Sequence, residues 1–350
     1  MSILNVDNLK TLSGNGIDAE IVSIGGGQLS NRNMIINGAM TVSQRGTSAL
    51  SVSNSGQNYQ VDMYRGRAQG GQFSIQQVTD APTGTGLYNS LKVQVTSADT
   101  SLANSAYHEL IQYIEGNNFL PTEYGGSGAK TCTLSFYVKS AVASTFTGAI
   151  GNVGNNRGFG FNYTINSANT WERKTITIPG DTTGSWNKSN SVGAKIIFAL
   201  GIGANFATAN VNTWETRETM GTDDGYNLMA STANYINFTG IQFEIGDTAT
   251  TFEHRSIGDE FIRCQRYFAK GRTELCFNGV SGRYGWRTLG QYNMRATPTV
   301  SATFHSSGMG SIHGYGARRE SGSDTTQILV QTSAGYGADG YFVYEATSEF

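Results

Sequence analysis

The sequence predicts an all-β protein: an antiparallel jelly-roll sandwich, one short amphipathic helix and a smaller C-terminal β-sandwich domain. Three observations favour this class. Short segments in which apolar and polar residues alternate recur along most of the chain, as in strands that bury one face. Gly, Asn, Ser and Thr fill the connections between these segments. Only residues 256–271 carry apolar side chains at helical spacing.

The composition is that of a folded chain with a polar, nearly neutral surface. Charged residues are 14% of the 350, well below the usual share of roughly 25%. The 17 Phe, 17 Tyr and 4 Trp exclude a disordered chain. A net charge of −2 supplies no overall basic field, so we expect no nucleic-acid partner. No apolar run reaches 18 residues, so we expect no membrane insertion.

Residues 1–29 form the first predicted part of the chain, and they end near three consecutive glycines at 25–27. A segment of this length cannot bury its apolar side chains alone, so we expect it to pack on another chain or on the following domain. The side chains that we expect to make this contact are Leu4, Val6, Leu9, Leu12, Ile17 and Ile21. The first ten residues lack the pattern of a secretory signal, which predicts synthesis in a reducing cytoplasm with buried, inert cysteines.

Residues 30–255 are predicted to form the jelly-roll body. Strand-like segments recur there with turn residues between them, and no segment keeps a helical period. A series of short strands over this length is typical of one antiparallel sandwich. The predicted strands are 73–78, 91–96, 131–139, 171–178, 195–202 and 235–245.

Residues 256–271 are predicted to form the connecting helix. Ser256 and Asp259 resemble a capping box, and Gly271 is placed as the residue that ends the helix. We expect this helix to pack on the sandwich or against its copies in an oligomer. Its apolar stripe consists of Ile257, Phe261, Cys264 and Phe268.

Residues 272–350 return to strand-like segments, at 273–280, 298–305, 326–332 and 341–346. We interpret them as a second, smaller β-domain. Aromatic side chains and arginines are abundant in its polar, Gly-rich sequence, and they suit the apolar face and hydroxyl rim of a sugar. The alternative is that many of these rings fill the small core. The predicted glycan-binding residues are Tyr284, Trp286, His305, His313, Tyr315, Arg318, Arg319 and Tyr336.

The sequence offers little catalytic chemistry. It has no His-Glu-x-x-His zinc motif, no Gly-x-Ser-x-Gly elbow and no phosphate-binding loop. His305 and His313 could meet, but a zinc site needs three or four ligands. Asp223-Asp224 is interpreted as a turn, with a calcium site or an acid/base pair as alternatives. We therefore predict no enzyme activity, no metal and no cofactor.

Several segments resemble one family of proteins, the tail fibres and virion appendages of bacteriophages. Residues 31–46, which begin Asn-Arg-Asn-Met and end Gln-Arg-Gly, resemble the opening of that family. The resemblance is strongest at 241–256 and at 264–268. Asp62-Met63-Tyr64 departs from the Asp-Arg-Trp-like triplet that the family has there. The first residues, Met-Ser-Ile-Leu-Asn-Val-Asp-Asn-Leu-Lys, are similar to appendage proteins of marine and cyanobacterial phages.

This resemblance implies a carbohydrate-binding-module-like jelly roll and a structural role in the virion, usually as a homotrimer. Residues 1–29 would then attach to another virion protein, and the C-terminal β-domain would contact a host surface polysaccharide or lipopolysaccharide. The protein would be made in the host cytoplasm and located in the virion. A capsid decoration, head-fibre or adaptor protein is the first alternative. A polysaccharide depolymerase that uses Asp223 or Glu244 is the second.

Overall fold

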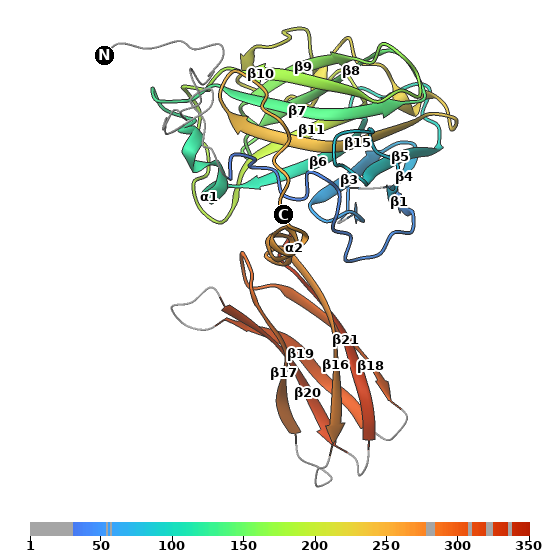
Figure 1. The fold of residues 1–350 in the computed structure, drawn as a ribbon, viewed down its shortest axis with the longest axis vertical. Coiled ribbons are helices and arrows are strands. Elements are labelled where there is room, and N and C mark those ends of the chain that lie inside the picture. Colours follow the sequence, from blue (N-terminus) through green and yellow to red (C-terminus); the bar gives the residue numbers. More distant parts are fainter. Residues whose placement is uncertain are drawn as a thin grey trace, which may run out of the picture.

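The computed structural model describes residues 31–53, 55–56, 58–277, 284–306, 310–319, 325–334 and 338–350. The predicted attachment residues at 1–29 lie outside these ranges. Figure 1 shows a large two-sheet body, a small β-domain below it, and a short helix where the two meet. We call these parts the body and the distal domain.

One sheet of the body has six antiparallel strands. Most of its neighbouring strands lie far apart in the sequence, as the jelly-roll prediction requires. All of its strands except β1 were predicted from the sequence. Their predicted first and last residues lie within one residue of the observed ones. The order is β1 (Leu50–Val52), β4 (Gln72–Val78), β5 (Ser90–Ser97), β15 (Tyr235–Ile245), β7 (Cys132–Ser140) and β10 (Glu172–Ile178).

The facing sheet has seven strands, of which the sequence predicted only β11 in outline. A short helix, α1 (Gly116–Phe119), and a 3₁₀ turn at Leu120–Thr122 follow its β6 strand. A further 3₁₀ turn, Leu228–Ala230, precedes β15, and β12 (Ala207–Thr208) pairs in parallel with β14 (Gly221–Thr222). The order of the seven strands is β13 (Trp214–Glu215), β9 (Gly158–Thr164), β8 (Thr145–Gly151), β11 (Val192–Ile202), β6 (Tyr107–Glu115), β3 (Tyr64–Gln69) and β2 (Asn58–Tyr59).

Aromatic side chains dominate the core between the two sheets. Phe136 of β7 packs edge-on against Phe198 of β11, with ring centroids 5.1 Å apart. Phe238 of β15 lies 4.6 Å from the same Phe198 ring. All three are buried. The predicted antiparallel sandwich is thus confirmed, and its core is the apolar face of the alternating segments. Cys132 and Cys264 are buried free thiols, as predicted.

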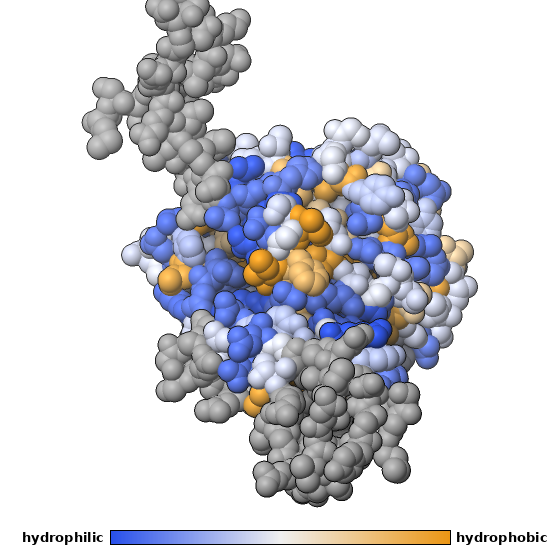
Figure 2. Space-filling view, turned by 60° about the horizontal axis from the view of Figure 1, so that its bottom comes forward, coloured by the Kyte–Doolittle hydropathy of each residue, from blue (hydrophilic) through white to orange (hydrophobic). Residues whose placement is uncertain are grey.

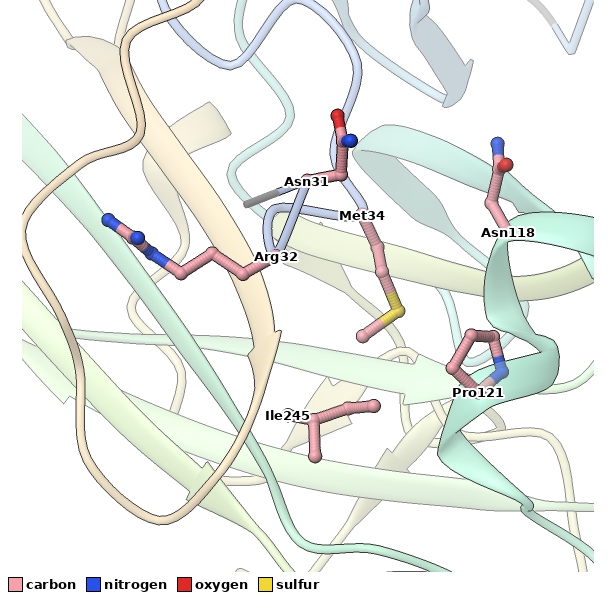
Figure 3. A pocket seen from close by; sticks show the side chains of 6 residues that line it. All are labelled: Asn31, Arg32, Met34, Asn118, Pro121 and Ile245. Carbon is pink, nitrogen blue, oxygen red and sulfur yellow. The ribbon is translucent and has the colours of Figure 1, made fainter. Parts of the chain in front are cut away.

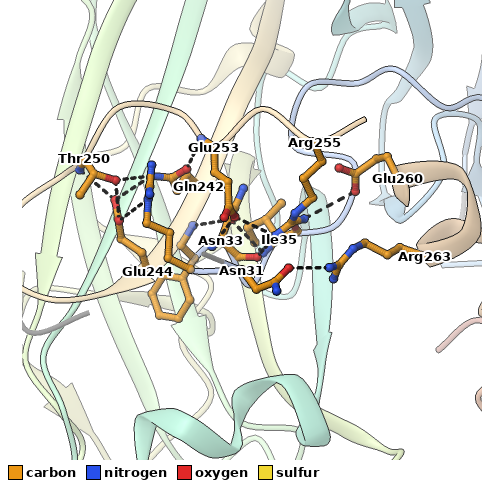
Figure 4. Close-up of polar contacts among 12 residues, drawn as sticks. Asn31, Asn33, Ile35, Gln242, Glu244, Thr250, Glu253, Arg255, Glu260 and Arg263 are labelled. Carbon is orange, nitrogen blue, oxygen red and sulfur yellow. Dashed lines mark hydrogen bonds and ion pairs between the residues drawn. The ribbon is translucent and has the colours of Figure 1, made fainter. Parts of the chain in front are cut away.

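The segments that carry the family resemblance meet in one buried polar network (Figure 4). The Asn33 side chain binds the backbone of β15 through Ile241 and Phe243. Glu253 accepts the backbone N–H of Asn33, and Arg255 donates to the carbonyl of Ile35. Residues 31–35 and 241–255 therefore hold each other in place.

The helix α2 (Ile257–Gln265) is shorter than predicted. Its start is as expected: the Ser256 hydroxyl accepts the backbone N–H of Asp259 at 3.1 Å. Its end differs from the prediction, because β16 (Phe268–Phe277) begins three residues after Gln265. Gly271 does not stop the helix but pairs with Tyr344 inside the sheet. The prediction of a helix to residue 271 was wrong.

The distal domain consists of two three-stranded sheets, as predicted for a smaller β-sandwich. Its core includes Phe342, Tyr344 and Ile328, all buried. Among the described residues, no helix has the length and apolar character that crossing a membrane would require. One sheet is β16, β21 (Ala338–Thr347) and β18 (Thr299–Ser306); the other is β17 (Tyr284–Asn293), β20 (Thr325–Ala334) and β19 (Gly310–Arg319).

Candidate functional site

The candidate site lies on the outer face of the seven-stranded sheet. Side chains alternate along a strand, so β6 sends Leu110 and Ile114 into the core between the sheets. The neighbouring positions, Tyr107, Ile111 and Tyr113, belong to a separate apolar cluster on the other face. This second cluster requires a cover of its own, because it faces away from the main core.

The loop between β11 and β14 provides that cover. Phe206 packs edge-on against Tyr107, with ring centroids 5.9 Å apart. Met220 is buried in the same cluster, and its backbone N–H donates to the carbonyl of Phe206 at 2.9 Å. The cover is incomplete, and it leaves a pocket between the loop and the sheet.

This sheet-face pocket has a volume of about 270 Å³, just below the range of roughly 300–1,000 Å³ for ligand pockets. Its residues come from three strands, from the connection between β8 and β9, and from the covering loop. They are Arg67, Tyr107, Tyr113, Val153, Asn155, Lys195, Phe206, Glu218 and Met220.

Two ion pairs fix the charges of the pocket. Arg67 Nη1 lies 2.7 Å from Glu109 Oε1, and the Arg67 guanidinium lies 4.6 Å from the centre of the Tyr107 ring. Lys195 Nζ donates to Glu218 Oε1 at 2.8 Å and to Asn155 Oδ1 at 2.6 Å. Each cation is thus matched by a carboxylate, so the pocket is highly polar without net charge.

Glu109 is the most unusual group at this site. Its side chain is fully buried, and neither oxygen has a hydrogen-bond donor in line among the described residues. Burial raises the pKa of the carboxyl group, and the positive charges of Arg67 and Lys195 only partly offset that effect. The Glu109 carboxylate therefore holds Arg67 in the pocket. In turn, the positive charge of Arg67 stabilises the buried carboxylate.

This arrangement suits a saccharide. Tyr107, Tyr113 and Phe206 offer apolar ring surfaces, while the paired charges offer fixed donors and acceptors for hydroxyl groups. An anionic ligand would have to compete with Glu109 and Glu218 for the same cations. In the described part of the chain, no three His, Cys, Asp or Glu side chains gather where they could hold a metal ion.

The distal domain holds the residues that the sequence predicted as the glycan site. His305 lies on the sheet of β16, β21 and β18, whereas six others lie on β17 and β19 of the opposite sheet. Tyr336 and the side chains of these six lie outside the described residues, so their binding role stays a prediction. The six are Tyr284, Trp286, His313, Tyr315, Arg318 and Arg319.

The register of these strands places the backbone positions of two of the predicted residues. Trp286 is opposite Gln331 of β20, whereas Arg318 is opposite Gln327 of the same strand. Four positions along β20 separate the two levels, or about 13 Å. The positions of Trp286 and Arg318 therefore lie at different levels of the sheet, and their role in binding stays a prediction.

His305 has a described aromatic neighbour. Its ring stacks on Tyr341 at 4.8 Å between centroids, and the Arg272 guanidinium lies 3.8 Å from the centre of the same Tyr341 ring. These three side chains belong to β18, β21 and β16. They form a cluster of two rings and one cation on the sheet of β16, β21 and β18, whereas Trp286 lies on the other sheet of the distal domain.

The acidic residues considered for catalysis do not form a pair. Asp223 and Asp224 are exposed in a turn, as predicted. Glu244 is 1% exposed, and its carboxylate accepts hydrogen bonds from Thr250 and Gln242 (Figure 4). Glu244 thus uses its carboxylate to hold the end of β15 against Thr250.

Two further hollows differ from the sheet-face pocket. One, of about 40 Å³, lies where the described chain begins; Figure 3 shows Met34, Pro121 and Ile245 around it. It is too small for a sugar ring. The other, of about 340 Å³, lies between α2 and the distal domain, beside Arg266 and Tyr292. Figure 2 shows a described surface that is mostly hydrophilic, with small apolar patches, as the composition predicted.

The sheet-face pocket was not predicted from the sequence. One signal was present in β6, where Tyr107, Glu109 and Tyr113 are spaced by even numbers and must share a face. The other lining residues come from segments up to 113 positions from Tyr107 in the sequence, and no local pattern connects them.

No family model matches the chain, and no curated protein matches it. Among solved structures, the enzymatically active domain of tailspike protein 4 of bacteriophage CBA120 is 13% identical, with a TM-score of 0.33 over 61% of this chain. This chain spans 21% of that domain's length. An exo-β-agarase is 13% identical over 59% of this chain and 26% of its own, with a TM-score of 0.30.

The family 11 carbohydrate-binding module from Clostridium thermocellum, solved with a β-1,3-1,4-mixed-linked tetrasaccharide, is 14% identical. The match covers 58% of this chain and all of the module, with a TM-score of 0.29. The chain is thus distantly similar in structure to carbohydrate-binding-module-like β-sandwiches and to a phage tailspike domain.

Proposed function

We propose that this protein is a non-enzymatic bacteriophage virion appendage that binds host surface carbohydrate through the sheet-face pocket. The observation that carries the binding proposal is the pocket itself. It combines aromatic walls with charges that are already paired. Sugar hydroxyls both donate and accept hydrogen bonds, so they can use both members of each ion pair.

The paired charges also favour a class of glycan. A carboxylate or phosphate on the ligand would meet Glu218, which is the more exposed of the two acidic partners. A neutral sugar meets no such repulsion. We therefore propose neutral segments of a host polysaccharide or lipopolysaccharide as the ligand.

The virion role rests on the sequence resemblance. Two of the segments that carry it, 31–46 and 241–256, contribute to one buried network in the body. The resemblance therefore concerns the fold of the body. We propose that residues 1–29 attach the protein to another virion protein and that it assembles as a homotrimer. Light scattering of the purified chain tests the trimer, and mass spectrometry of purified particles tests the location.

Binding is tested with the full chain on a panel of immobilised neutral and acidic bacterial polysaccharides. We expect the unaltered chain to retain at least one neutral member and Tyr107→Ala to lose at least tenfold in affinity for it, because one stacking ring is worth roughly 0.5–1.5 kcal/mol beyond its buried area. Tyr235→Ala is the matched control, since Tyr235 is a partly buried tyrosine of the other sheet. Equal binding by Tyr107→Ala and the unaltered chain would exclude this pocket.

A further inference from the structure

Tyr113 connects the sheet-face pocket to a second structural element. One side of Tyr113 lines the pocket. Its ring also packs against the ring of Phe350, with centroids 5.8 Å apart, and its hydroxyl accepts a hydrogen bond from Arg65 Nη1 at 3.3 Å. The position of this pocket wall thus depends on Arg65 and Phe350, neither of which lines the pocket.

Phe350 is itself held firmly against the body. The Tyr59 hydroxyl donates to its backbone oxygen at 3.1 Å, and Arg65 Nη1 lies 3.5 Å from the same atom. The Arg295 guanidinium lies 4.0 Å from the centre of the Phe350 ring. The Phe350 ring therefore contacts one cation, Arg295, and two aromatic rings, Tyr113 and Tyr267.

A short segment that includes Phe350 joins the distal domain to the body. Residues 348–350 directly follow β21 and lead from the distal domain onto the body (Figure 1). The backbone N–H of Ser348 donates to the carbonyl of Tyr267 at 2.7 Å, and Arg295 Nε donates to the carbonyl of Ser348 at 2.8 Å. Arg45 of the body pairs with Glu349 in the same segment. Displacement of the distal domain would therefore displace Phe350 from Tyr113.

We infer that Phe350 is a positioning residue for glycan binding: it couples the sheet-face pocket to the docking of the distal domain through Tyr113. This inference rests on the proposed function of the pocket. The pocket keeps its wall only while the distal domain is docked. Because coupling between two sites is reciprocal, a glycan in the pocket also strengthens the docking of residues 348–350.

The test measures the affinity of full-chain variants for the panel polysaccharide that the unaltered chain retains. We expect Phe350→Ala to weaken binding about two- to thirtyfold, the range of indirect coupling between sites, while the body still unfolds in one cooperative transition. Phe350→Tyr keeps the ring and is expected to bind within twofold of the unaltered chain. Asn190→Ala is the matched control, since it removes a hydrogen bond to Arg295 at the same junction without touching Tyr113.

Hydrogen exchange of the free protein separates this inference from the proposed function. We expect Phe350→Ala to raise exchange in residues 107–113 and in the covering loop at 203–222, and Asn190→Ala to leave both unchanged. If the unaltered chain retains no polysaccharide, the proposed function fails, and exchange alone decides the coupling. Unchanged exchange in Phe350→Ala, or unchanged affinity where a polysaccharide is retained, would overturn the inference.

Discussion

The body and the distal domain use aromatic side chains differently. In the body, Phe136, Phe198 and Phe238 fill a large core, and Tyr107 and Tyr113 remain on an outer face beside a pocket. In the distal domain, whose described core is small, Tyr344 and Tyr292 instead bond to each other through their hydroxyls at 2.7 Å. An abundance of aromatic residues in a segment is therefore weaker evidence for a ligand site than the presence of a second, outward-facing layer.

The two regions also differ in how far their outer aromatic clusters are exposed to solvent. The outer cluster of the body is covered by a loop that contributes Phe206 and Met220. In the distal domain, the described outer cluster of His305, Tyr341 and Arg272 lies on a sheet face, and His305 and Arg272 are exposed. A covered cluster can enclose a ligand, whereas an open one presents a flat surface. The following variants test this comparison.

The largest effect is expected in the core of the body. Phe136→Ala removes a fully buried ring that contacts Phe198, and we expect a loss of about 3–5 kcal/mol in the free energy of unfolding. Denaturant unfolding followed by fluorescence measures this loss. Tyr88→Ala is the control: Tyr88 is 71% exposed, and the change should stay within about 0.5 kcal/mol. Similar losses in the two variants would contradict the described core.

The junction between the two regions should respond to pH. Burial raises the pKa of Glu349 to about 7, although its pairing with Arg45 opposes this shift. Because the folded state favours the protonated carboxyl, this contribution to stability is complete below pH 4.5 and is lost as the pH rises through 7. Relative to the ordinary glutamate pKa of 4.5, the total is at most about 3–4 kcal/mol.

Unfolding of the full chain between pH 4 and 8 measures this effect. Asp62 and Arg45 are the charged groups nearest to Glu349, and neither is altered in Glu349→Gln. We expect Glu349→Gln to flatten the decline between pH 4.5 and 7. An unchanged decline in that variant would mean that another group is responsible.

The distal domain should be sensitive to one added methyl group. A Cβ at Gly271 would lie within 2.3 Å of the Tyr344 hydroxyl, so we expect Gly271→Ala to cost about 1–3 kcal/mol. Adding Tyr344→Phe removes the clashing oxygen and should recover part of the loss. Thermal unfolding measures both variants. Part of the loss should remain, because the Tyr344 ring carbons Cζ and Cε1 also lie 2.5 and 2.8 Å from that Cβ position. A Gly271→Ala variant as stable as the unaltered chain would contradict this close contact.

The smallest effect concerns the start of the connecting helix. Ser256→Ala removes the cap on the Asp259 backbone N–H, and we expect a cost of about 1 kcal/mol. Ser256→Asp keeps an acceptor oxygen and should retain most of the stability. Equal losses in both variants, measured by thermal unfolding, would mean that the hydroxyl does not cap α2.

The sequence predicted elements whose cause is local and failed where the cause is distant. The alternation in 131–139 and 235–245 places apolar side chains on one face, so both strands were predicted almost to the residue. The helix end was wrong because Phe268 continues the helical spacing, yet it lies under the Arg45 guanidinium at 3.5 Å and begins β16. Nothing near Phe268 in the sequence indicates that contact with Arg45.

The candidate site followed the same rule. Tyr107, Glu109 and Tyr113 alternate within β6, so their shared face could be predicted. Lys195 reaches the pocket only because β11 pairs with β6 in the sheet, and Glu218 reaches it only because the covering loop brings it to Lys195. The sequence instead drew attention to Tyr284 and Trp286, which are close together in the chain.

The most direct test of the central claim, that the body rather than the distal domain binds glycan, compares two single variants. Calorimetric titration with the retained polysaccharide would measure Tyr107→Ala and Trp286→Ala beside the unaltered full chain. We predict that Tyr107→Ala loses at least tenfold in affinity while Trp286→Ala binds as the unaltered chain does. Unchanged binding by Tyr107→Ala together with loss in Trp286→Ala would contradict the account and assign binding to the distal domain.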